Sequence, residues 1–185
     1  MSNSLLERIT VSGFGGQGVM LVGQLLAYAG NAKGKETLWF PSYGPETRGG
    51  TANCAVTISD TAINSPVFSK ANTVIAMNEP SLIKFASKVR DDGYIFYNSS
   101  LGTSEKLNLK AKVYNIPVND LAVELNNIRV ANMIILGAYL EVSNLFTDDE
   151  VLNVLKTLFG PERSHLIEIN KTALQVGRNY IKNNY

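Results

Sequence analysis

The chain has 185 residues, of which 45% are apolar and 18% charged, and its formal net charge is +1. This length and composition predict one globular domain, residues 1–185, and the balanced charge gives no basic footprint for nucleic acid or an anionic membrane. The one cysteine excludes an internal disulfide and any zinc or iron-sulfur site built on several thiolates of this chain, in keeping with a reducing compartment.

No stretch of the sequence predicts passage into or across a membrane. Residues 1–8 lack both the basic segment and the continuous apolar segment of a secretory signal peptide. The longest apolar runs, near residues 19–29 and 133–140, are too short for a bilayer and are interrupted by glycine or polar residues. We therefore expect a cytoplasmic protein with no membrane span.

The first predicted unit is a strand, a glycine-rich turn and a helix. Residues 9–12 form a β-branched run, and apolar residues recur at helical spacing over residues 19–29. Between them lies the turn Gly13-Phe14-Gly15-Gly16-Gln17-Gly18, which fits the pattern G-x-G-x-x-G. A helix start has unpaired N–H groups and a partial positive charge, and glycines let an anion approach the backbone. The turn predicts a phosphate site, and a dinucleotide-binding fold is the first hypothesis.

The second predicted strand, residues 37–40, weakens that hypothesis. A dinucleotide-binding fold ends its second strand with an acidic residue that holds the ribose hydroxyls. Here Glu36 precedes the strand, and Pro41 is expected to stop it. The missing acid argues against NAD or FAD.

A second loop, residues 41–51, is rich in glycine and proline and carries an opposed Glu46 and Arg48. In one interpretation it is a surface crossover whose turn-forming residues only set backbone angles. In the other it is a shaped loop beside the first turn, where Arg48 presents a fork of donors to a phosphate or carboxylate. Tyr43 either stacks on an adenine or a partner chain or is a half-buried loop aromatic.

The remaining chain alternates strands and helices. Strands are expected over residues 52–59, 73–77, 94–98 and 112–116, with a helix that starts at the N-cap Asn78 and is ended by residues 91–93. Helical patterns follow Pro117, including residues 150–159 behind the N-cap Thr147 and a last helix over about residues 167–181. This order predicts an α/β fold: a mostly parallel sheet with helices on both faces, a Rossmann-like three-layer arrangement that ends in a helical part.

Single polar residues do not form a catalytic set. Cys54, inside a strand, is expected to be a small core residue, and His165 to lie at the surface or cap a turn. On a predicted helix, Asn132 is expected to bond a loop or a partner and Gly137 to permit close packing. We expect no catalytic residue and no metal site in this chain.

Four motifs in this order resemble one known family. They are residues 13–18, the segment Tyr43-Gly44-Pro45-Glu46-Thr47-Arg48-Gly49-Gly50-Thr51-Ala52-Asn53-Cys54, residues 76–80, and residues 132–138. The chain resembles the gamma subunit of the 2-oxoacid:ferredoxin (acceptor) oxidoreductases, which are thiamine-diphosphate and iron-sulfur enzymes. The likeness covers most of the chain, and Thr47 stands where many members of the family have methionine.

The resemblance implies a subunit of a complex that converts a 2-oxoacid and CoA to an acyl-CoA and CO2 and passes electrons to ferredoxin or a similar acceptor. Thiamine diphosphate, Mg and the iron-sulfur clusters would sit in alpha, beta and in some members delta partner subunits, and the isolated chain would be inactive. This chain would help to form the CoA side of the site. The implied contact residues lie in the two loops: Gly13, Gly15, Gly16, Gln17, Gly18, Tyr43, Arg48, Gly49 and Gly50.

Two questions stay open from the sequence. The form Tyr-Gly-Pro-Glu-x-Arg-Gly-Gly resembles the 2-oxoglutarate and branched-chain members more than the indolepyruvate members, and we favour 2-oxoglutarate. The alternatives to a gamma subunit that touches CoA are a free-standing Rossmann-like nucleotide-binding module and a purely structural scaffold subunit whose loops contact other proteins.

Overall fold

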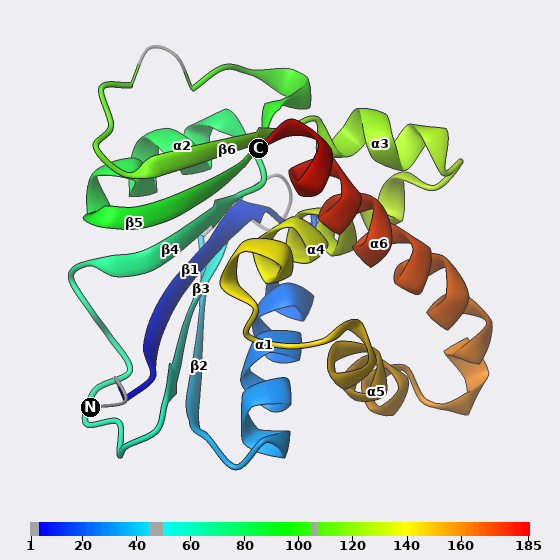
Figure 1. Cartoon of the computed structure of the whole chain (residues 1–185), viewed down its shortest axis with the longest axis horizontal. Coiled ribbons are helices and arrows are strands. Elements are labelled where there is room, and N and C mark those ends of the chain that lie inside the picture. The colour runs from blue at the N-terminus through cyan, green and yellow to red at the C-terminus, as the bar shows by residue number, and fades with distance from the viewer. Residues whose placement is uncertain (1–3, 45–49, 105–106) are drawn as a thin grey trace.

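A computed structural model describes residues 4–44, 50–104 and 107–185. Their strands form one six-stranded sheet in the order β2-β3-β1-β4-β5-β6 (Figure 1). Only β3 runs against the direction of the others, so the sheet is mostly parallel. The strands are β1 (Leu6–Phe14), β2 (Glu36–Tyr43), β3 (Thr51–Ser59), β4 (Ala71–Ala76), β5 (Val89–Asn98) and β6 (Lys112–Ile116).

Helices cover both faces of the sheet, unequally. One face carries α1 (Val19–Ala32) and α4 (Ala131–Ser143), with α6 (Ile167–Asn184) packed on α4 and α5 (Asp148–Phe159) packed on α1 and α6 (Figure 1). The other face is covered over β4 and β5 by α2 (Glu79–Phe85), while α3 (Val118–Glu124) follows β6 and packs on α4. The α/β fold with a helical C-terminal part is therefore confirmed. No helix among the described residues combines the length and apolarity that a bilayer span requires.

Alternation along β4 shows how the sequence builds two cores. Ile75 and Met77 join the larger core under α1 and α4, whereas Val74 and Ala76 join the smaller core under α2. A strand places successive side chains on opposite faces, so a continuous apolar run serves a sheet that is covered on both sides. This is the behaviour that the apolar run 73–77 predicts.

The C-terminal helical layer depends on close contact between α4 and α6. All residues of α4 from Ala131 to Leu140 are buried, because the helix lies between the sheet and α6. A Cβ atom at Gly137 would lie 2.1 Å from the carbonyl oxygen of Leu174, and one at Gly177 would lie 1.8 Å from that of Ile134. The expectation that Gly137 permits close packing is confirmed.

Both predicted N-caps are present. The Asn78 side chain accepts a hydrogen bond from Ser81 N at the start of α2. At α5, Thr147 Oγ1 accepts from Glu150 N while the Glu150 carboxylate accepts from Thr147 N, which is a complete capping box. These bonds satisfy N–H groups that a helix start leaves without partners.

Two local expectations were wrong. The strand β2 does not stop at Pro41 but continues to Tyr43, which an edge strand allows because a missing N–H there costs no ladder bond. The segment after α2 is already strand from Val89, so residues 91–93 do not end a helix. The strand β2 is joined to the rest of the sheet by β3, which lies between β1 and β2 and runs antiparallel to both.

Candidate functional site at the first glycine loop

The first glycine loop lies at the point where chain connections leave the sheet in opposite directions. After β1 the chain crosses through α1 to β2 on one side, and after β4 it crosses through α2 to β5 on the other. Since β1 and β4 are parallel neighbours, their carboxyl ends lie side by side between these connections. Ligands of open α/β sheets bind at such switch points.

The side chain of Gln17 holds the loop against the end of β4. Its Oε1 atom accepts hydrogen bonds from Phe14 N at 2.7 Å and from Asn78 Nδ2 at 2.8 Å. Its Nε2 atom donates to the carbonyl oxygen of Met77 at 3.3 Å. From its position at the helix start, Gln17 could either donate to a ligand or cap a neighbouring N–H group, and these bonds favour the cap.

The four loop glycines serve different purposes. A Cβ atom at Gly13 would lie 2.7 Å from Gln17 Oε1, so this buried residue must be small for packing. By contrast, Gly15 and Gly16 are exposed, and a Cβ atom at either would meet nothing within 4 Å. Gly16 and Gly18 have φ of 94° and 74°, which glycine adopts at little cost. The open backbone at Gly15 and Gly16 is the part of the loop that an anion can approach.

Two helix N-termini meet at this loop. Gly18 is the N-cap of α1 and has no side chain to bond the N–H groups of the first turn. Asn132, in the first turn of α4, donates from Nδ2 to the carbonyl oxygen of Gly18 at 3.4 Å. The predicted bond between Asn132 and a loop is therefore present, and it brings the positive ends of two helix dipoles together.

The second glycine loop reaches the first, as its functional interpretation requires. Gly15 N donates to the carbonyl oxygen of Gly50 at 3.2 Å. Tyr43, at the end of β2, is 69% exposed, so it is not a half-buried aromatic in the isolated chain. Arg48 and Gly49 lie outside the described residues. The structure thus brings Gly50 to the first loop and leaves Tyr43 open to solvent.

The strand order gives a further reason against a dinucleotide site. Because β3 separates β1 from β2, the end of β2 lies two strand spacings from β1, about 10 Å. A side chain at that position cannot hold a ribose in the way that an adjacent second strand does.

A polar network beyond the loop was missed in the sequence. Asn98, the last residue of β5, donates from Nδ2 to the carbonyl oxygen of Met77 at 3.2 Å and to Asn119 Oδ1 at 3.1 Å. Its Oδ1 atom accepts from Val118 N. A buried asparagine directly after an apolar strand was the signal available. The network fixes the carboxyl ends of β4 and β5 beside the loop.

In the described part of the chain, neither Cys54 nor His165 makes a hydrogen bond to residues 13–18. Cys54 is fully buried, as expected, and burial raises the pKa of its thiol to about 12. His165 is exposed in the short helical segment Pro161–Leu166, on the far side of α5 and α6. Within the described residues, no group of three or more His, Cys, Asp or Glu side chains is placed to hold a metal ion.

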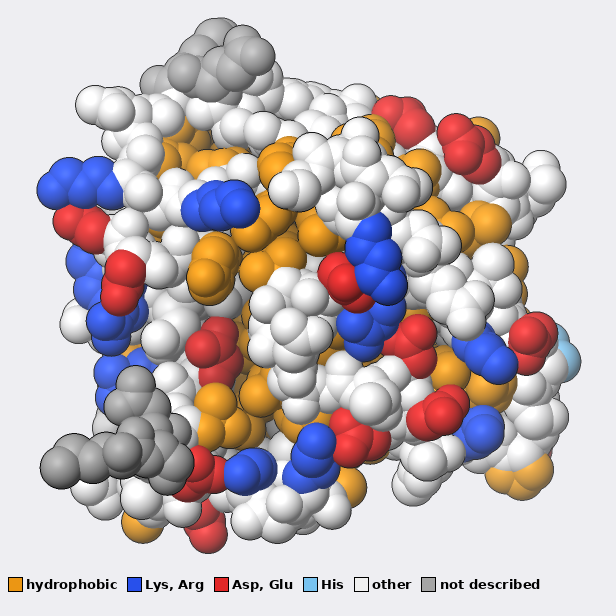
Figure 2. Space-filling model, in the orientation of Figure 1, with side chains coloured by type: hydrophobic (Ala, Val, Ile, Leu, Met, Phe, Trp, Pro, Cys, Tyr) orange, Lys and Arg blue, Asp and Glu red, His pale blue; other side chains and the backbone are white. Residues whose placement is uncertain are grey.

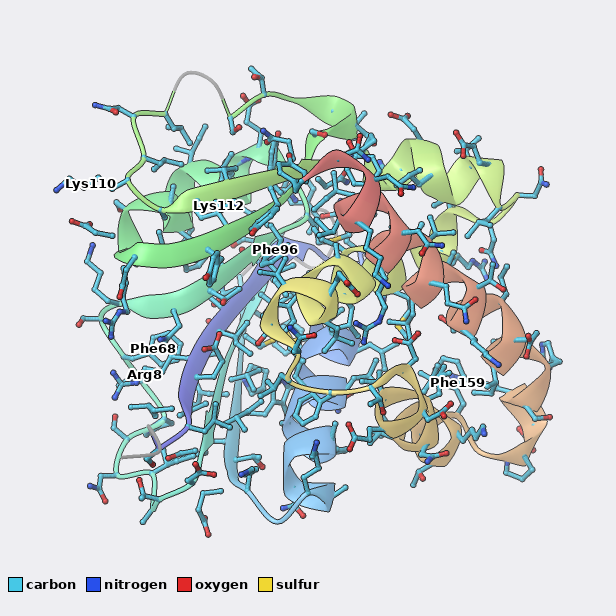
Figure 3. All side chains as sticks on the ribbon, viewed as in Figure 1. Arg8, Phe68, Phe96, Lys110, Lys112 and Phe159 are labelled. Atoms are coloured by element: carbon cyan, nitrogen blue, oxygen red, sulfur yellow. The ribbon has the colours of Figure 1, made fainter. Side chains whose placement is uncertain are left out.

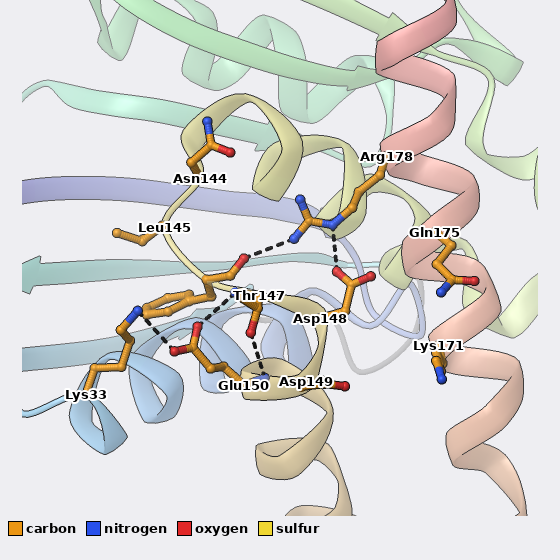
Figure 4. A pocket seen from close by; sticks show the side chains of 11 residues that line it. Lys33, Asn144, Leu145, Thr147, Asp148, Asp149, Glu150, Lys171, Gln175 and Arg178 are labelled. Atoms are coloured by element: carbon orange, nitrogen blue, oxygen red, sulfur yellow. Dashed lines mark hydrogen bonds and ion pairs between the residues drawn. The ribbon is translucent and has the colours of Figure 1, made fainter.

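A polar hollow of about 530 Å³ lies elsewhere, between the end of α1, the segment before α5, and α6 (Figure 4). Its walls are joined by ion pairs: Arg178 bonds Asp148 at 2.6 Å, and Lys33 bonds Glu150 at 3.0 Å. Arg178 also donates to the carbonyl oxygen of Phe146. The first of these ion pairs holds α6 to the start of α5, and the second holds the end of α1 to it.

Comparison with known proteins identifies the family. Residues 8–180 match the pyruvate ferredoxin/flavodoxin oxidoreductase family. The chain belongs to this family. The resemblance drawn from the four motifs is thereby confirmed.

Three similar proteins place the chain within the family. It is 35% identical to the ketoisovalerate oxidoreductase subunit VorA of Methanothermobacter marburgensis, over 96% of this chain but 37% of that protein. It matches the gamma subunit of a keto/oxoacid ferredoxin oxidoreductase from Geobacter sulfurreducens over 96% of this chain and 99% of that one, with a TM-score of 0.80 and 25% identity. The 2-oxoglutarate:ferredoxin oxidoreductase of Magnetococcus marinus, solved with 2-oxoglutarate, coenzyme A and succinyl-CoA bound, gives a TM-score of 0.87 and 25% identity over 97% of this chain and 32% of that one.

The share of each protein's length that this chain spans differs among the three similar proteins. The chain spans about a third of VorA and of the Magnetococcus chain but nearly all of the Geobacter gamma subunit. In this family the fold is therefore found both as a separate subunit and as a segment of a longer chain.

Proposed function

We propose that the chain is the gamma subunit of a 2-oxoacid:ferredoxin oxidoreductase complex, and that its first glycine loop lies on the CoA side of the site. The observation that carries this proposal is the open backbone of Gly15 and Gly16 where the N-termini of α1 and α4 meet. Support comes from the Magnetococcus enzyme, a structural neighbour with coenzyme A bound.

The chemistry of CoA suits this loop. CoA carries a diphosphate and a 3′-phosphate, and unpaired backbone N–H groups at a helix start bind such anions. In the proposal, Gly15, Gly16 and Gly18 bring the backbone to a phosphate, while Gln17 holds the loop in shape. Arg48 and Gly49 of the second loop belong to the proposal from the sequence alone, with Tyr43 and Gly50 at its edges.

The redox groups belong to partner subunits in this proposal. Iron-sulfur clusters are held by several cysteine thiolates, and the only cysteine of this chain is buried in a strand. Thiamine diphosphate would supply the decarboxylation chemistry and the clusters would carry the electrons. The chain contributes shape and anion binding at an interface with alpha and beta subunits, in the cytoplasm, and is inactive alone.

For the oxoacid, we propose 2-oxoglutarate. The second glycine motif favours it, and the Magnetococcus neighbour is a 2-oxoglutarate enzyme. A branched-chain 2-oxoacid is the second candidate, because the ketoisovalerate relative has 35% identity. Turnover of both oxoacids and pyruvate by the complex that co-purifies with the tagged chain decides between them.

The proposal is tested by a substitution that fills the loop without straining it. Gly15 has open space and an ordinary φ, so Gly15→Val adds bulk where a phosphate would approach. In the assembled complex, we expect Gly15→Val to raise the KM for CoA at least tenfold and leave the KM for the 2-oxoacid unchanged. Ala32→Val, at the exposed opposite end of α1, likewise creates a valine, away from the loop, and serves as the control.

Each alternative predicts a different result. An unchanged KM for CoA in Gly15→Val, with normal subunit stoichiometry, would favour the scaffold subunit. Micromolar binding of NAD or FAD to the purified chain, measured by calorimetry, would favour the free-standing nucleotide module and overturn the proposal.

A further inference from the structure

A second pocket lies at the other end of β1 from the glycine loop, between the beginnings of β1 and β4, the second half of β5 and the end of α4. Its volume is about 230 Å³, and its lining includes Leu5, Glu7, Thr73, Tyr94, Phe96 and Tyr139. Glu7 and Gly13 both belong to β1, six residues or about 20 Å apart. The pocket is therefore separate from the proposed CoA contact.

The carboxylate of Glu7 is the one acidic group in this pocket, and it is only partly satisfied. Its Oε1 atom accepts hydrogen bonds from Thr73 Oγ1 at 2.8 Å and from Tyr139 OH at 3.5 Å. The described residues supply no hydrogen bond to Oε2 and no ion pair to Glu7. A half-buried carboxylate with a free oxygen atom attracts a cationic donor.

The charged groups around the pocket do not fill that role within the chain. Arg90, on β5, forms an ion pair with Asp92 at 2.9 Å. Its positive charge lowers the pKa of Glu7 from a distance, without an ion pair between the two. Lys112, on β6, lies over the ring of Tyr114 at 4.8 Å. Burial raises the pKa of the Glu7 carboxyl, although the bonds from Thr73 and Tyr139 and the charge of Arg90 oppose this.

Aromatic side chains form a large part of the remaining pocket lining, beside Leu5, Val142 and Leu145. Phe96 meets Tyr139 edge to face at 5.6 Å between β5 and α4 (Figure 3), and Tyr94, beside them, is 40% exposed. Figure 2 shows hydrophobic side chains at the surface over β4 and β5, where α4 and α6 leave the sheet uncovered. Aromatic faces attract ammonium and guanidinium groups, so they add to the attraction of the carboxylate.

We propose that this pocket binds an organic cation: an alkylammonium or guanidinium group on a short apolar stem, with Glu7 as its counter-ion and Tyr94 and Phe96 against its stem. The volume is below that of pockets for larger cofactors and suits one such group. The group has two possible sources with the same chemistry, a small free cation or a basic side chain of a partner subunit.

The test uses the full chain and two matched probes. Butylguanidinium carries the charge, and butylurea has nearly the same shape without it. We expect butylguanidinium to bind saturably and shift the NMR signals of Tyr94, Phe96 and Tyr139, with at least tenfold higher affinity than butylurea. Glu7→Gln, which keeps an acceptor for Thr73 and Tyr139, should remove that difference, whereas Glu36→Gln, at the exposed start of β2, should preserve it.

Two results would overturn the proposal. One is equal affinity for both probes, or an affinity for butylguanidinium that Glu7→Gln leaves unchanged. The other is binding that appears only in Arg90→Gln, because Arg90 would then be the cation that Glu7 already has. Tyr94→Ser, at a partly exposed position, gives a second variant if Glu7→Gln fails to fold, and it should weaken butylguanidinium binding severalfold.

The assembled complex then distinguishes the two sources. If a partner's basic side chain fills the pocket, the complex will not bind butylguanidinium, and Glu7→Gln will weaken subunit association. If a free cation is the occupant, the complex will bind butylguanidinium as tightly as the isolated chain does.

Discussion

Gln17 and Asn78 are joined by a 2.8 Å hydrogen bond between Oε1 and Nδ2, although 61 residues separate them in the chain. The same Gln17 oxygen accepts from Phe14 N, and the same Asn78 caps α2 through Ser81 N. One glutamine thus connects the turn after β1 to the helix start after β4. The shape of the glycine loop is therefore fixed by β4 as well as by its own glycines.

Removal of the Gln17 side chain should destabilise the chain. In Gln17→Ala, Phe14 N and Asn78 Nδ2 lose the acceptor that they share, and an unsatisfied buried group costs about 1–3 kcal/mol. Urea unfolding measures this as a lower free energy of unfolding. Gln175→Ala, at an exposed position on α6, is the control and should change it little. Equal stability of the two variants would show that the loop does not depend on Gln17.

The contact between α4 and α6 predicts a stronger effect for glycine substitutions. In Gly177→Ala the new methyl group would collide with the backbone of Ile134, so the two helices must separate. We expect a loss of at least about 2 kcal/mol in the free energy of unfolding, as for overpacked cores. Gly15→Ala has open space at its Cβ position and is the matched control. A Gly177→Ala variant as stable as Gly15→Ala would contradict the packing described for α4.

Cys54 should be inert in the folded chain. Its thiol is fully buried, bonds the carbonyl oxygen of Val19 at 3.7 Å, and has its pKa raised to about 12 by burial. Because the thiolate is the reactive form, a disulfide reagent at about pH 8 should leave the native thiol unmodified and react fully after unfolding. In Ser87→Cys, an added exposed thiol should react at once, which verifies the reagent. Fast modification of native wild type would contradict this assignment.

The sequence predicted the α/β class because apolar runs such as 73–77 and helical spacing such as 19–29 are local patterns. It did not predict the place of β3. The run 52–59 is apolar on one face and half-buried on the other, and such a strand can pair in either direction. The strand predicted over residues 94–98 was shorter than β5 for a similar reason. Residues 91–93 resemble a turn, but they form an irregular stretch of strand beside β4.

The glycine loop and the Glu7 pocket differ in the same way. The glycine loop is contiguous in sequence, so its chemistry is visible in one segment, and the deciding partner Asn132 was found as part of a motif. The second pocket unites Glu7 with Thr73 and Tyr139, which are 66 and 132 residues away. No spacing rule connects residues at such separations. The residues next to a glutamate near the start of a strand also do not indicate that its side chain will be buried.

Glu7 should make the stability of the chain depend on pH with a definite sign. Burial raises the pKa of the folded carboxyl above its ordinary value of 4.5. The folded chain then keeps this proton to higher pH than the unfolded chain, so the free energy of unfolding falls as pH rises through that interval. Glu7→Gln cannot ionise and keeps the acceptor for Thr73, so we expect it to be more stable than wild type at neutral pH and equally stable in acid.

Urea unfolding between about pH 4 and pH 8 measures the difference in stability between Glu7→Gln and wild type, with Glu36→Gln as the exposed control. If Glu7→Gln destabilised the chain by the same amount at both ends of this range, the Glu7 carboxyl would carry no cost of burial, and the pocket would already hold its counter-ion.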